Sequence, residues 1–224
     1  MSMLSPLLRS NPAGPRLTLY DEAAGTRMEF SAQTLDNWAS KVANMLEAEF
    51  ELAPGSRLLI DVPASWQAAV IAIGAYNASL TPAFSLEAGA TGTDPDVVFT
   101  TLDRASAWAN VPDVVIVSPD PFGRGVVESG GELPLGAIDF GPTVRFYGDD
   151  YFGDSPELGT WLRGGTERGR YHAEPWETAG EFAERVMAPL AADGSVVVVT
   201  GLVSADRLQE ILGAENVTHF FTSR

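Results

Sequence analysis

Residues Ser56 to Ser85 carry the clearest structural signal of this sequence: S-R-L-L-I-D-V-P-A-S-W-Q-A-A-V-I-A-I-G-A-Y-N-A-S-L-T-P-A-F-S. The first part of this stretch, Arg57 to Val62, is an apolar run of strand length, and Pro63 ends it. Ser65 can cap a following helix, because its hydroxyl accepts a backbone N–H of the first turn. That helix, Trp66 to Ala78, is apolar on nearly every side, which indicates that it is buried.

A second short strand is expected at Leu80 to Phe84, directly after this helix. Two strands joined by a buried helix form a right-handed βαβ unit with parallel strands. The sequence therefore predicts an α/β fold with a mostly parallel central sheet covered by helices on both faces. Arg57 to Val62 should be an interior strand, with Leu59 and Ile60 nearly inaccessible on opposite faces.

The chain on either side of this stretch is expected to complete a single domain over residues 1–224. Residues 1–16 are expected to be a loosely attached arm, and residues 118–142, rich in Pro and Gly, a long surface loop. The other expected elements are an N-terminal β-hairpin (Leu17 to Tyr20 and Arg27 to Phe30), helices at Ser31 to Phe50, Asp103 to Asn110, from Pro175 to about Leu190 and at Ala205 to Leu212, strands at Val97 to Thr101, Val114 to Val117, Thr143 to Tyr147, Ser195 to Val199 and Val217 to Phe221, and a loop at Glu87 to Asp94.

Composition excludes several classes of function. The formal net charge is −16, and nucleic-acid backbones are bound mainly by Lys and Arg, so no nucleic-acid partner is expected. There are no cysteines, which removes disulfides and thiolate metal sites. No signal peptide or membrane span is read from the sequence, so a cytoplasmic, acidic protein is expected. The single lysine, Lys41, lies off the apolar stripe of its helix and is interpreted as a solvated charge.

Motifs over the first 82 residues resemble the N-terminal subdomain of adenylate-forming enzymes, the acyl-CoA synthetase and AMP-ligase superfamily. The family hairpin pattern "Y-D…G…x-x-[FY]-[ST]" is matched by Tyr20-Asp21, Gly25 and Phe30-Ser31. The family pattern "P-G-[DS]-R-[VL]" is matched by Pro54-Gly55-Ser56-Arg57-Leu58, and "N-S-x-E…G-x-x-x-[VT]-P" corresponds to the segment from Pro63 to Pro82. A later segment, Met187 to Val198, is similar to the family element "L-x-P-L-x-x-G-[AS]-x-[VL]-V-L".

The resemblance implies chemistry that the sequence does not support. Family enzymes stabilise charge on the phosphates of ATP with a loop "[YF]-T-S-G-[TS]-T-G-x-P-K-G" after a strand, and no such string occurs here. After the strand expected at Thr143 to Tyr147 come Gly148-Asp149-Asp150, whose carboxylates should repel ATP. The later family motifs and the lysine of the family's C-terminal domain do not occur within these 224 residues. Adenylate formation by this chain alone is not expected, and no catalytic or cofactor-binding residue is assigned.

A crevice at the carboxyl ends of the strands is where a small ligand would bind in such a sheet. Its candidate residues are Pro63, Ala64, Ser65, Gly148, Asp149, Asp150, Thr200 and Gly201. No metal site is assigned, although the acidic loop with Asp154 leaves open whether it binds a divalent ion. Gly164 to Arg170 is interpreted as an exposed turn rather than a phosphate-binding loop, because no strand precedes it and no clear helix follows it. His219 is interpreted as a packed histidine.

Three functions are consistent with these observations. The first is a non-catalytic remnant of the adenylate-forming fold, a pseudoenzyme that serves as a binding or interaction module. The second is a small-ligand binder or enzyme that reuses the crevice. The third is one half of a split adenylating enzyme, with a synthetase-like protein as partner. A homodimer is expected, with Tyr151 to Tyr171 helping to cover the apolar surface left by the missing parts.

Overall fold

The computed structural model describes residues 2–85 and 95–221 and divides the chain into two compact units. The first unit consists of Met1–Ser2 and Asp36–Pro156, and the second of Met3–Leu35 and Glu157–Arg224. The sequence predicts one domain, whereas the structure has a separate sheet in each unit. The expected loop at Glu87 to Asp94 falls on residues 86–94, outside the described residues.

A five-stranded parallel sheet forms the centre of the first unit, in the order β4-β3-β5-β6-β7. Its strands are β3 (Leu58–Asp61), β4 (Ala83–Phe84), β5 (Val97–Thr100), β6 (Asp113–Ile116) and β7 (Ile138–Asp139). β3 lies between β4 and β5, so the predicted interior strand is confirmed. Leu59 is 2% and Ile60 1% exposed, which confirms that both faces of this strand are covered.

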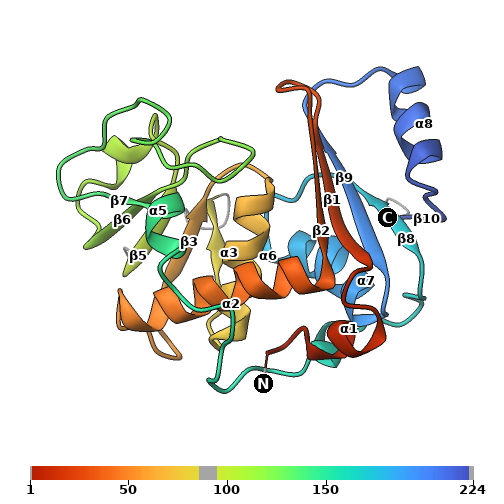
Figure 1. The fold of residues 1–224 in the computed structure, drawn as a ribbon, viewed down its shortest axis with the longest axis horizontal. Coiled ribbons are helices and arrows are strands. Elements are labelled where there is room, and N and C mark those ends of the chain that lie inside the picture. The colour runs from red at the N-terminus through yellow and green to blue at the C-terminus, as the bar shows by residue number, and fades with distance from the viewer. Residues whose placement is uncertain (1, 86–94, 222–224) are drawn as a thin grey trace. The chain divides into compact units, whose positions relative to one another are not determined.

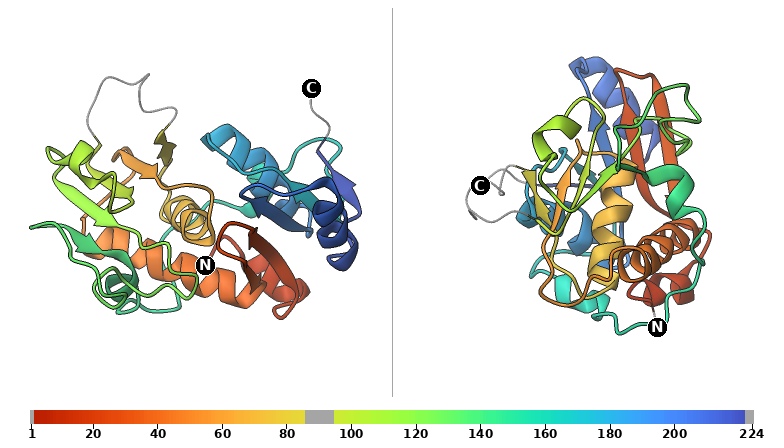
Figure 2. Two further views of the ribbon diagram at one scale, coloured as in Figure 1. Left: turned by 90° about the horizontal axis from the view of Figure 1, so that it is seen from above. Right: turned by 90° about the vertical axis from the view of Figure 1, so that its left-hand side faces the viewer.

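The helices of the first unit bury this sheet. In α3 (Trp66–Asn77) every residue is buried, and the Ser65 side chain caps it by accepting a hydrogen bond from the Ala68 N–H at 3.1 Å, as predicted. α2 (Ala32–Ala48) lies on the same side of the sheet as α3 (Figures 1 and 2). On the opposite face, Leu59 and Val98 pack against Trp108, which lies in the 3₁₀ turn η1 (Ala105–Trp108), and against Val111, which follows that turn. α5 (Phe140–Val144) follows β7 directly.

The second unit contains a five-stranded sheet in the order β10-β8-β9-β1-β2. Its strands are β1 (Pro15–Asp21), β2 (Thr26–Ser31), β8 (Arg170–Ala173), β9 (Ser195–Thr200) and β10 (His219–Phe220). β1 and β2 are the predicted antiparallel hairpin, and β1 also pairs in parallel with β9. The strand β8 was not predicted, because its alternation of charged and aromatic residues is only four residues long.

Helices cover both faces of the second sheet. α8 (Ala205–Ala214) places Ile211 in an apolar cluster with Tyr20, Val197 and Val199. A continuous helical segment lies on the other face (Figure 2), made of α6 (Ala179–Phe182), the π-helical turn η3 (Ala183–Met187) and α7 (Ala188–Ala191). The π-helical turn precedes Pro189, which has no N–H to give to the fourth preceding carbonyl.

Three expectations about local structure were wrong. Residues 1–16 are not a loosely attached arm, because α1 (Ser5–Ser10) forms there and Leu4 and Leu7 are no more than 1% exposed. Residues 143–147 are not a strand, because β6 pairs with Ile138–Asp139 and the chain then enters α5. The helix expected from Pro175 begins only at Ala179, where the Thr178 hydroxyl caps it.

The remaining loop regions agree with the sequence in part. Residues 118–137 contain no helix or strand, but β7 and the start of α5 fall within the expected loop at 118–142. In Tyr151 to Tyr171, Tyr151 and Leu158 are buried, whereas Phe152 is 88% exposed, so only part of this segment covers apolar surface. Within the segment Gly164 to Arg170, Gly164 and Gly165 form an exposed turn, as predicted, and Arg170 begins β8.

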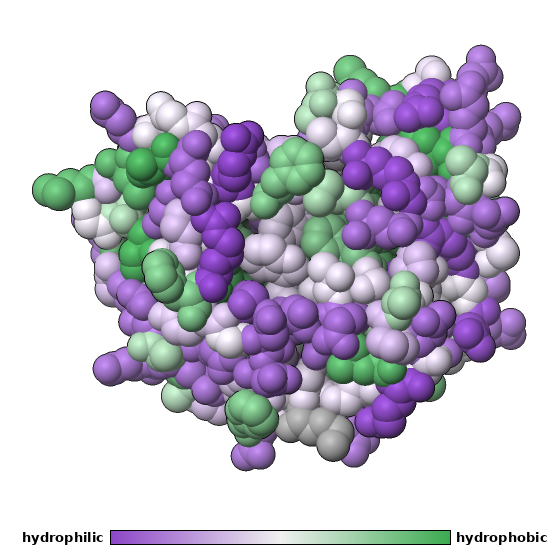
Figure 3. Space-filling view, viewed as in Figure 1, coloured by the Kyte–Doolittle hydropathy of each residue, from purple (hydrophilic) through white to green (hydrophobic). Residues whose placement is uncertain are grey.

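On the face shown in Figure 3, hydrophobic residues lie in separate areas between hydrophilic ones. Within residues 2–85 and 95–221, no helix combines the length and the apolar character needed to cross a bilayer.

Candidate functional site

The carboxyl edge of the first unit's sheet is the place where this topology would hold a ligand. The strand order corresponds to 2-1-3-4-5 in chain order, so the direction of winding reverses between β3 and β5. In doubly wound sheets, ligands bind at the carboxyl ends of the strands at this switch point. Asp61 ends β3 and Thr100 ends β5, and the two residues pair in register.

Asp61 is the centre of a hydrogen-bonded cluster at the switch point. Its side chain is 2% exposed, and Oδ2 accepts hydrogen bonds from Thr100 Oγ1 at 3.1 Å, Arg104 Nε at 2.8 Å and Trp108 Nε1 at 2.7 Å. Arg104 Nη2 lies 2.7 Å from the other carboxylate oxygen, Oδ1. A buried carboxylate requires such partners, and here they come from the strand and the turn that follow β3 in the sheet.

The predicted residues Pro63, Ala64 and Ser65 do lie at this edge, in the turn between β3 and α3. Pro63 is exposed, and the Ser65 hydroxyl is used in capping α3. The first turn of α3 also fixes the loop after β6, because Gln67 Nε2 donates to the carbonyls of Ser118 at 3.2 Å and Asp120 at 3.0 Å. This side of the edge is therefore held by hydrogen bonds within the chain.

Asp139 fixes the far end of the same edge. Its carboxylate, at the end of β7, accepts hydrogen bonds from the backbone N–H groups of Val126 at 3.1 Å and Val127 at 3.2 Å. Gly125 allows this approach, because a Cβ there would lie 2.4 Å from Asp139 Oδ2. The carboxylate thus organises the loop at residues 118–137 and is itself almost fully buried.

Gly148, Asp149 and Asp150 are not at a strand end, contrary to the predicted crevice. They lie against α2, where Asn44 Nδ2 donates to the Gly148 and Asp150 carbonyls at 3.2 and 3.0 Å. Lys41 Nζ lies 2.9 Å from Asp149 Oδ1 and donates to the Tyr147 carbonyl at 2.6 Å. The lysine was predicted to be a solvated charge, but its side chain is only 20% exposed.

Two tyrosines bind the segment Tyr147 to Tyr151 to α2 and to Glu49, which follows that helix. Tyr147 Oη donates to Glu49 at 2.5 Å, and Tyr151 Oη donates to Glu47. Burial and then the hydrogen bond to Glu49 raise the pKa of Tyr147 to about 12. Burial and then the hydrogen bond to Glu47 also raise the pKa of Tyr151, so both phenols stay protonated donors at neutral pH.

Thr200 and Gly201 belong to the second unit, at the end of β9. Thr200 Oγ1 donates to the Tyr20 carbonyl at 3.1 Å, which ties β9 to β1. Gly201 has φ of +83°, a conformation that glycine adopts without strain. Two of the three predicted groups of crevice residues thus lie at separate places in the first unit, and the third, Thr200 and Gly201, lies in the second unit.

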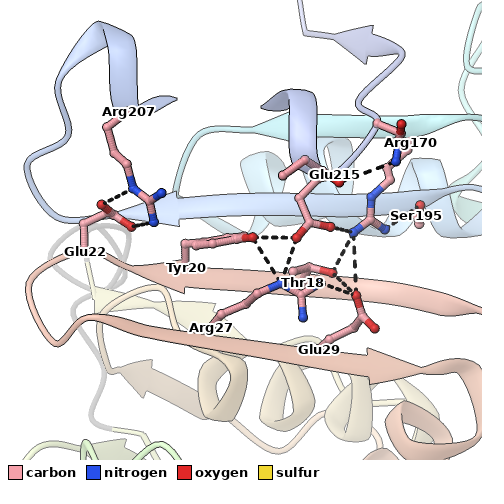
Figure 4. Close-up of polar contacts among 11 residues, drawn as sticks. Thr18, Tyr20, Glu22, Arg27, Glu29, Arg170, Ser195, Arg207 and Glu215 are labelled. Atoms are coloured by element: carbon pink, nitrogen blue, oxygen red, sulfur yellow. Dashed lines mark hydrogen bonds and ion pairs between the residues drawn. The ribbon is translucent and has the colours of Figure 1, made fainter. Parts of the chain in front are cut away.

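A second polar cluster lies on the α8 side of the second unit's sheet (Figure 4). Glu215 follows α8, and its side chain is 7% exposed. One carboxylate oxygen accepts hydrogen bonds from Tyr20 Oη at 2.6 Å and Arg27 Nε at 2.8 Å, and the other is bonded to Arg170. Arg170 also donates to Thr18 Oγ1 at 2.9 Å.

The charges of this cluster stabilise one another. Burial alone would raise the pKa of Glu215, but the hydrogen bonds from Arg27, Tyr20 and Arg170 lower it to about 2. Burial, followed by the bond to Glu215, raises the pKa of Tyr20. Glu215 is therefore an anion at neutral pH in the folded chain, and the cluster joins α8 to β1, β2 and β8.

No group of three or more His, Cys, Asp or Glu side chains is arranged to hold a metal ion in the part of the chain that the structure describes. His219, interpreted as a packed histidine, stacks on Tyr171 with ring centroids 4.7 Å apart.

The sequence reasoning missed the residues of both polar clusters. Asp61 lies inside the apolar run Arg57 to Val62, and a charged residue within a buried strand was the one signal available for it in the sequence. Its partners Arg104 and Trp108 lie 43 and 47 residues away and carry no local motif. Glu215 has no such signal, because it follows an amphipathic helix at a position that is usually solvated.

Comparison with solved structures shows the class of fold. An acyl-CoA synthetase from Brucella canis matches 98% of this chain with a TM-score of 0.73 and 17% identity. Acetoacetyl-CoA synthetase from Streptomyces lividans also matches 98% of the chain, with a TM-score of 0.75 and 15% identity. The chain has the fold of part of an acyl-CoA synthetase and spans less than half of each of these enzymes, 47% and 42%.

A relative at higher identity shows the family. A protein of Mycobacterium tuberculosis described as "TIGR03089 family protein" is 34% identical over 214 residues, covering 92% of this chain and 76% of the relative. This chain belongs to the TIGR03089 family. No family model matches the chain.

Proposed function

We propose that this chain is a non-catalytic binding or interaction module built on the acyl-CoA synthetase-like fold. The observation that carries the proposal is the Asp61 cluster. At the switch point, where such sheets bind ligands, a buried carboxylate already holds the nearby Arg104 guanidinium. A phosphate placed there would meet a negative charge whose cation is already bound.

Electrostatics opposes ATP at this edge. Two like charges about 4 Å apart repel by about 1 to 4 kcal/mol, depending on the local dielectric constant. Lys41, the one lysine of the sequence, lies on α2 and is bound to Asp149 and to the Tyr147 carbonyl. The sequence also lacks the glycine-rich and hydroxyl-rich loop that the synthetase resemblance requires. These observations support an interaction role over adenylation.

The proposal includes a cytoplasmic location and a protein partner, either a second copy or a synthetase-like chain. The absence of cysteine is consistent with a reducing compartment. The charge of −16 supports a protein partner over nucleic acid, since phosphate backbones would be repelled.

Calorimetry with ATP and Mg²⁺ at millimolar concentration tests the proposal. We expect no 1:1 isotherm for this chain, with an acyl-CoA synthetase as the positive control. The variant Arg104→Gln and the matched variant Arg163→Gln, at an exposed arginine outside the cluster, should behave like the parent chain.

A dissociation constant below about 100 μM, or about −5.5 kcal/mol, would contradict the proposal. If Arg104→Gln abolished that isotherm and Arg163→Gln did not, the switch point would be an ATP site.

A further inference from the structure

β2 is an edge strand. In the second unit's sheet it pairs with β1 on one side, and it is the last strand in the order β10-β8-β9-β1-β2. In an antiparallel edge strand, every second residue directs its backbone N–H and C=O groups away from the sheet. An edge of this kind is a template for another strand unless it is shortened, bulged or covered. The one register irregularity of the β1–β2 pair lies in β1, between Pro15 and Leu17, opposite the end of β2. The six residues Thr26–Ser31 are long enough to pair with a strand of similar length.

The sequence of β2, T-R-M-E-F-S, is complementary to itself in one antiparallel register. When two copies meet with Met28 opposite Met28, Arg27 of each copy lies opposite Glu29 of the partner subunit. Directly opposed residues lie on the same face of a sheet, so two pairs of opposite charge form side by side. The side chains of Arg27 and Glu29 are 42% and 34% exposed, which leaves both able to reach a neighbour.

Other registers are less favourable. A slip of two residues in either direction places Arg27 opposite the partner's Arg27 or Glu29 opposite the partner's Glu29, and like charges directly opposed are destabilising. A slip of one residue places a charged side chain opposite an apolar one and joins the polar face of one sheet to the other face of its neighbour. The charges therefore select the register centred on Met28.

The network of Figure 4 holds these charges in place before a second copy arrives. Arg27 Nε is fixed 2.8 Å from Glu215, and Arg27 Nη2 lies 2.5 Å from Glu29 of the same strand. Side chains that are already ordered lose less conformational entropy on association than free ones.

We infer that two copies of this chain pair through β2, antiparallel about a two-fold axis at Met28, and form a continuous ten-stranded sheet. This inference rests on the proposed function as an interaction module and names its surface and its partner. The pairing closes on itself, because a two-fold contact uses the same strand of both subunits. The opposite edge, β10, has only two residues in the described chain, too few to propagate the sheet.

Cross-linking gives a sharp test, because the natural chain has no cysteine. Directly opposed residues of an antiparallel pair have Cα atoms about 4.5 to 5.5 Å apart, which is within the range that a disulfide spans. Under mild oxidation at micromolar concentration, Met28→Cys should be converted mostly to a covalent dimer. The matched control Phe220→Cys carries its thiol on the β10 edge, at a residue that is 60% exposed, and should remain mostly monomeric.

Sedimentation tests the same interface without a covalent bond. We expect the parent chain to sediment as a dimer at micromolar concentration, and Met28→Lys to weaken dimerisation at least tenfold, because two ammonium groups meet at the axis. Phe220→Lys should leave the dimer intact. Thermal melts of the variants show whether each remains folded.

A parent chain that is monomeric up to about 100 μM would overturn the inference. A dimer in which Met28→Cys cross-links no better than Phe220→Cys would overturn it as well. Neither result bears on ATP binding, so failure of this inference is distinguishable from failure of the proposed function.

Discussion

At the scale of single residues, Glu215 joins a helix to a sheet. Glu215 directly follows α8, and its carboxylate accepts hydrogen bonds from side chains of β1, β2 and β8. Such a carboxylate stabilises the folded state only while all its partners are present. If they are removed, the charge stays buried and its desolvation cost is no longer offset. Glu215 should therefore be a major determinant of the stability of the second unit.

Replacing Glu215 with Gln should destabilise the chain at pH 7 by about 3 kcal/mol. The pKa of Glu215 is about 2 when folded and 4.5 when free, so the carboxylate's contribution is complete above pH 4.5. It is lost as the pH falls from 4.5 towards 2. Urea unfolding of the parent and Glu215→Gln, measured between pH 7 and pH 3, should show the gap in unfolding free energy narrowing with acidity.

The matched control is Glu210→Gln, on the exposed side of α8, where the side chain is 71% exposed. This change should alter stability by no more than about 0.5 kcal/mol at any pH in the range. A gap for Glu215→Gln that stayed constant from pH 7 to pH 3 would show that its charge is not what stabilises the fold.

At the scale of elements, the close packing of α3 on α2 depends on Gly74. A Cβ at this position would lie 2.5 Å from the Val42 side chain and 2.9 Å from the Ala39 carbonyl oxygen. The two helices approach this closely because one of them has no side chain at the contact. Glycine otherwise disfavours a helix interior by about 1 kcal/mol relative to alanine.

Gly74→Ala should therefore destabilise the chain, by about 1 to 3 kcal/mol, although alanine is the better helix former. Gly213→Ala is the matched control, because Gly213 lies in α8 and a Cβ there would meet nothing within 4 Å. That change should stabilise the chain by up to about 1 kcal/mol. Denaturant midpoints of the two variants measure both effects. A higher midpoint for Gly74→Ala than for the parent chain would contradict the prediction, because it would mean that the helices separate without cost.

At the scale of the whole molecule, the two units differ in how the chain builds them. The first is nearly one continuous segment, Asp36–Pro156, and contains its complete sheet. The second combines Met3–Leu35 with Glu157–Arg224, and β1 from the first segment pairs with β9 from the last. The second unit therefore depends on contacts between residues nearly 200 positions apart.

The fragment Glu157–Arg224 should be unfolded by itself, because β9 loses its neighbour β1 and the apolar cluster loses Tyr20. Adding the peptide Met3–Leu35 should restore strand signal in circular dichroism. A peptide carrying Leu19→Asp should not, since Leu19 is 6% exposed and pairs in register with Val198. Cooperative thermal unfolding of Glu157–Arg224 alone would contradict this expectation.

Elements with local signals could be predicted from the amino-acid sequence alone. The strand at Leu58–Asp61, the buried helix at Trp66–Asn77 and its Ser65 cap follow from an apolar run, a helix-length apolar segment and one hydroxyl. The hairpin β1-β2 follows from two alternating runs around a short turn. Each of these signals spans a short window of the sequence, so the pattern of neighbouring side chains is enough to predict the element.

Long-range contacts set the strand at Ile138–Asp139, the clusters around Asp61 and Glu215, and the position of Gly148 to Asp150 against α2. Residues 143–147 have strand-forming side chains, but they do not form a strand. The strand that pairs with β6 is Ile138–Asp139, and the residues that follow it form α5. The partners of Asp61 are up to 47 residues away, and those of Glu215 up to 195. Such contacts depend on which distant segments the sheets bring together, because hydrogen bonds and ion pairs act over a few ångströms in space, whatever the separation along the chain.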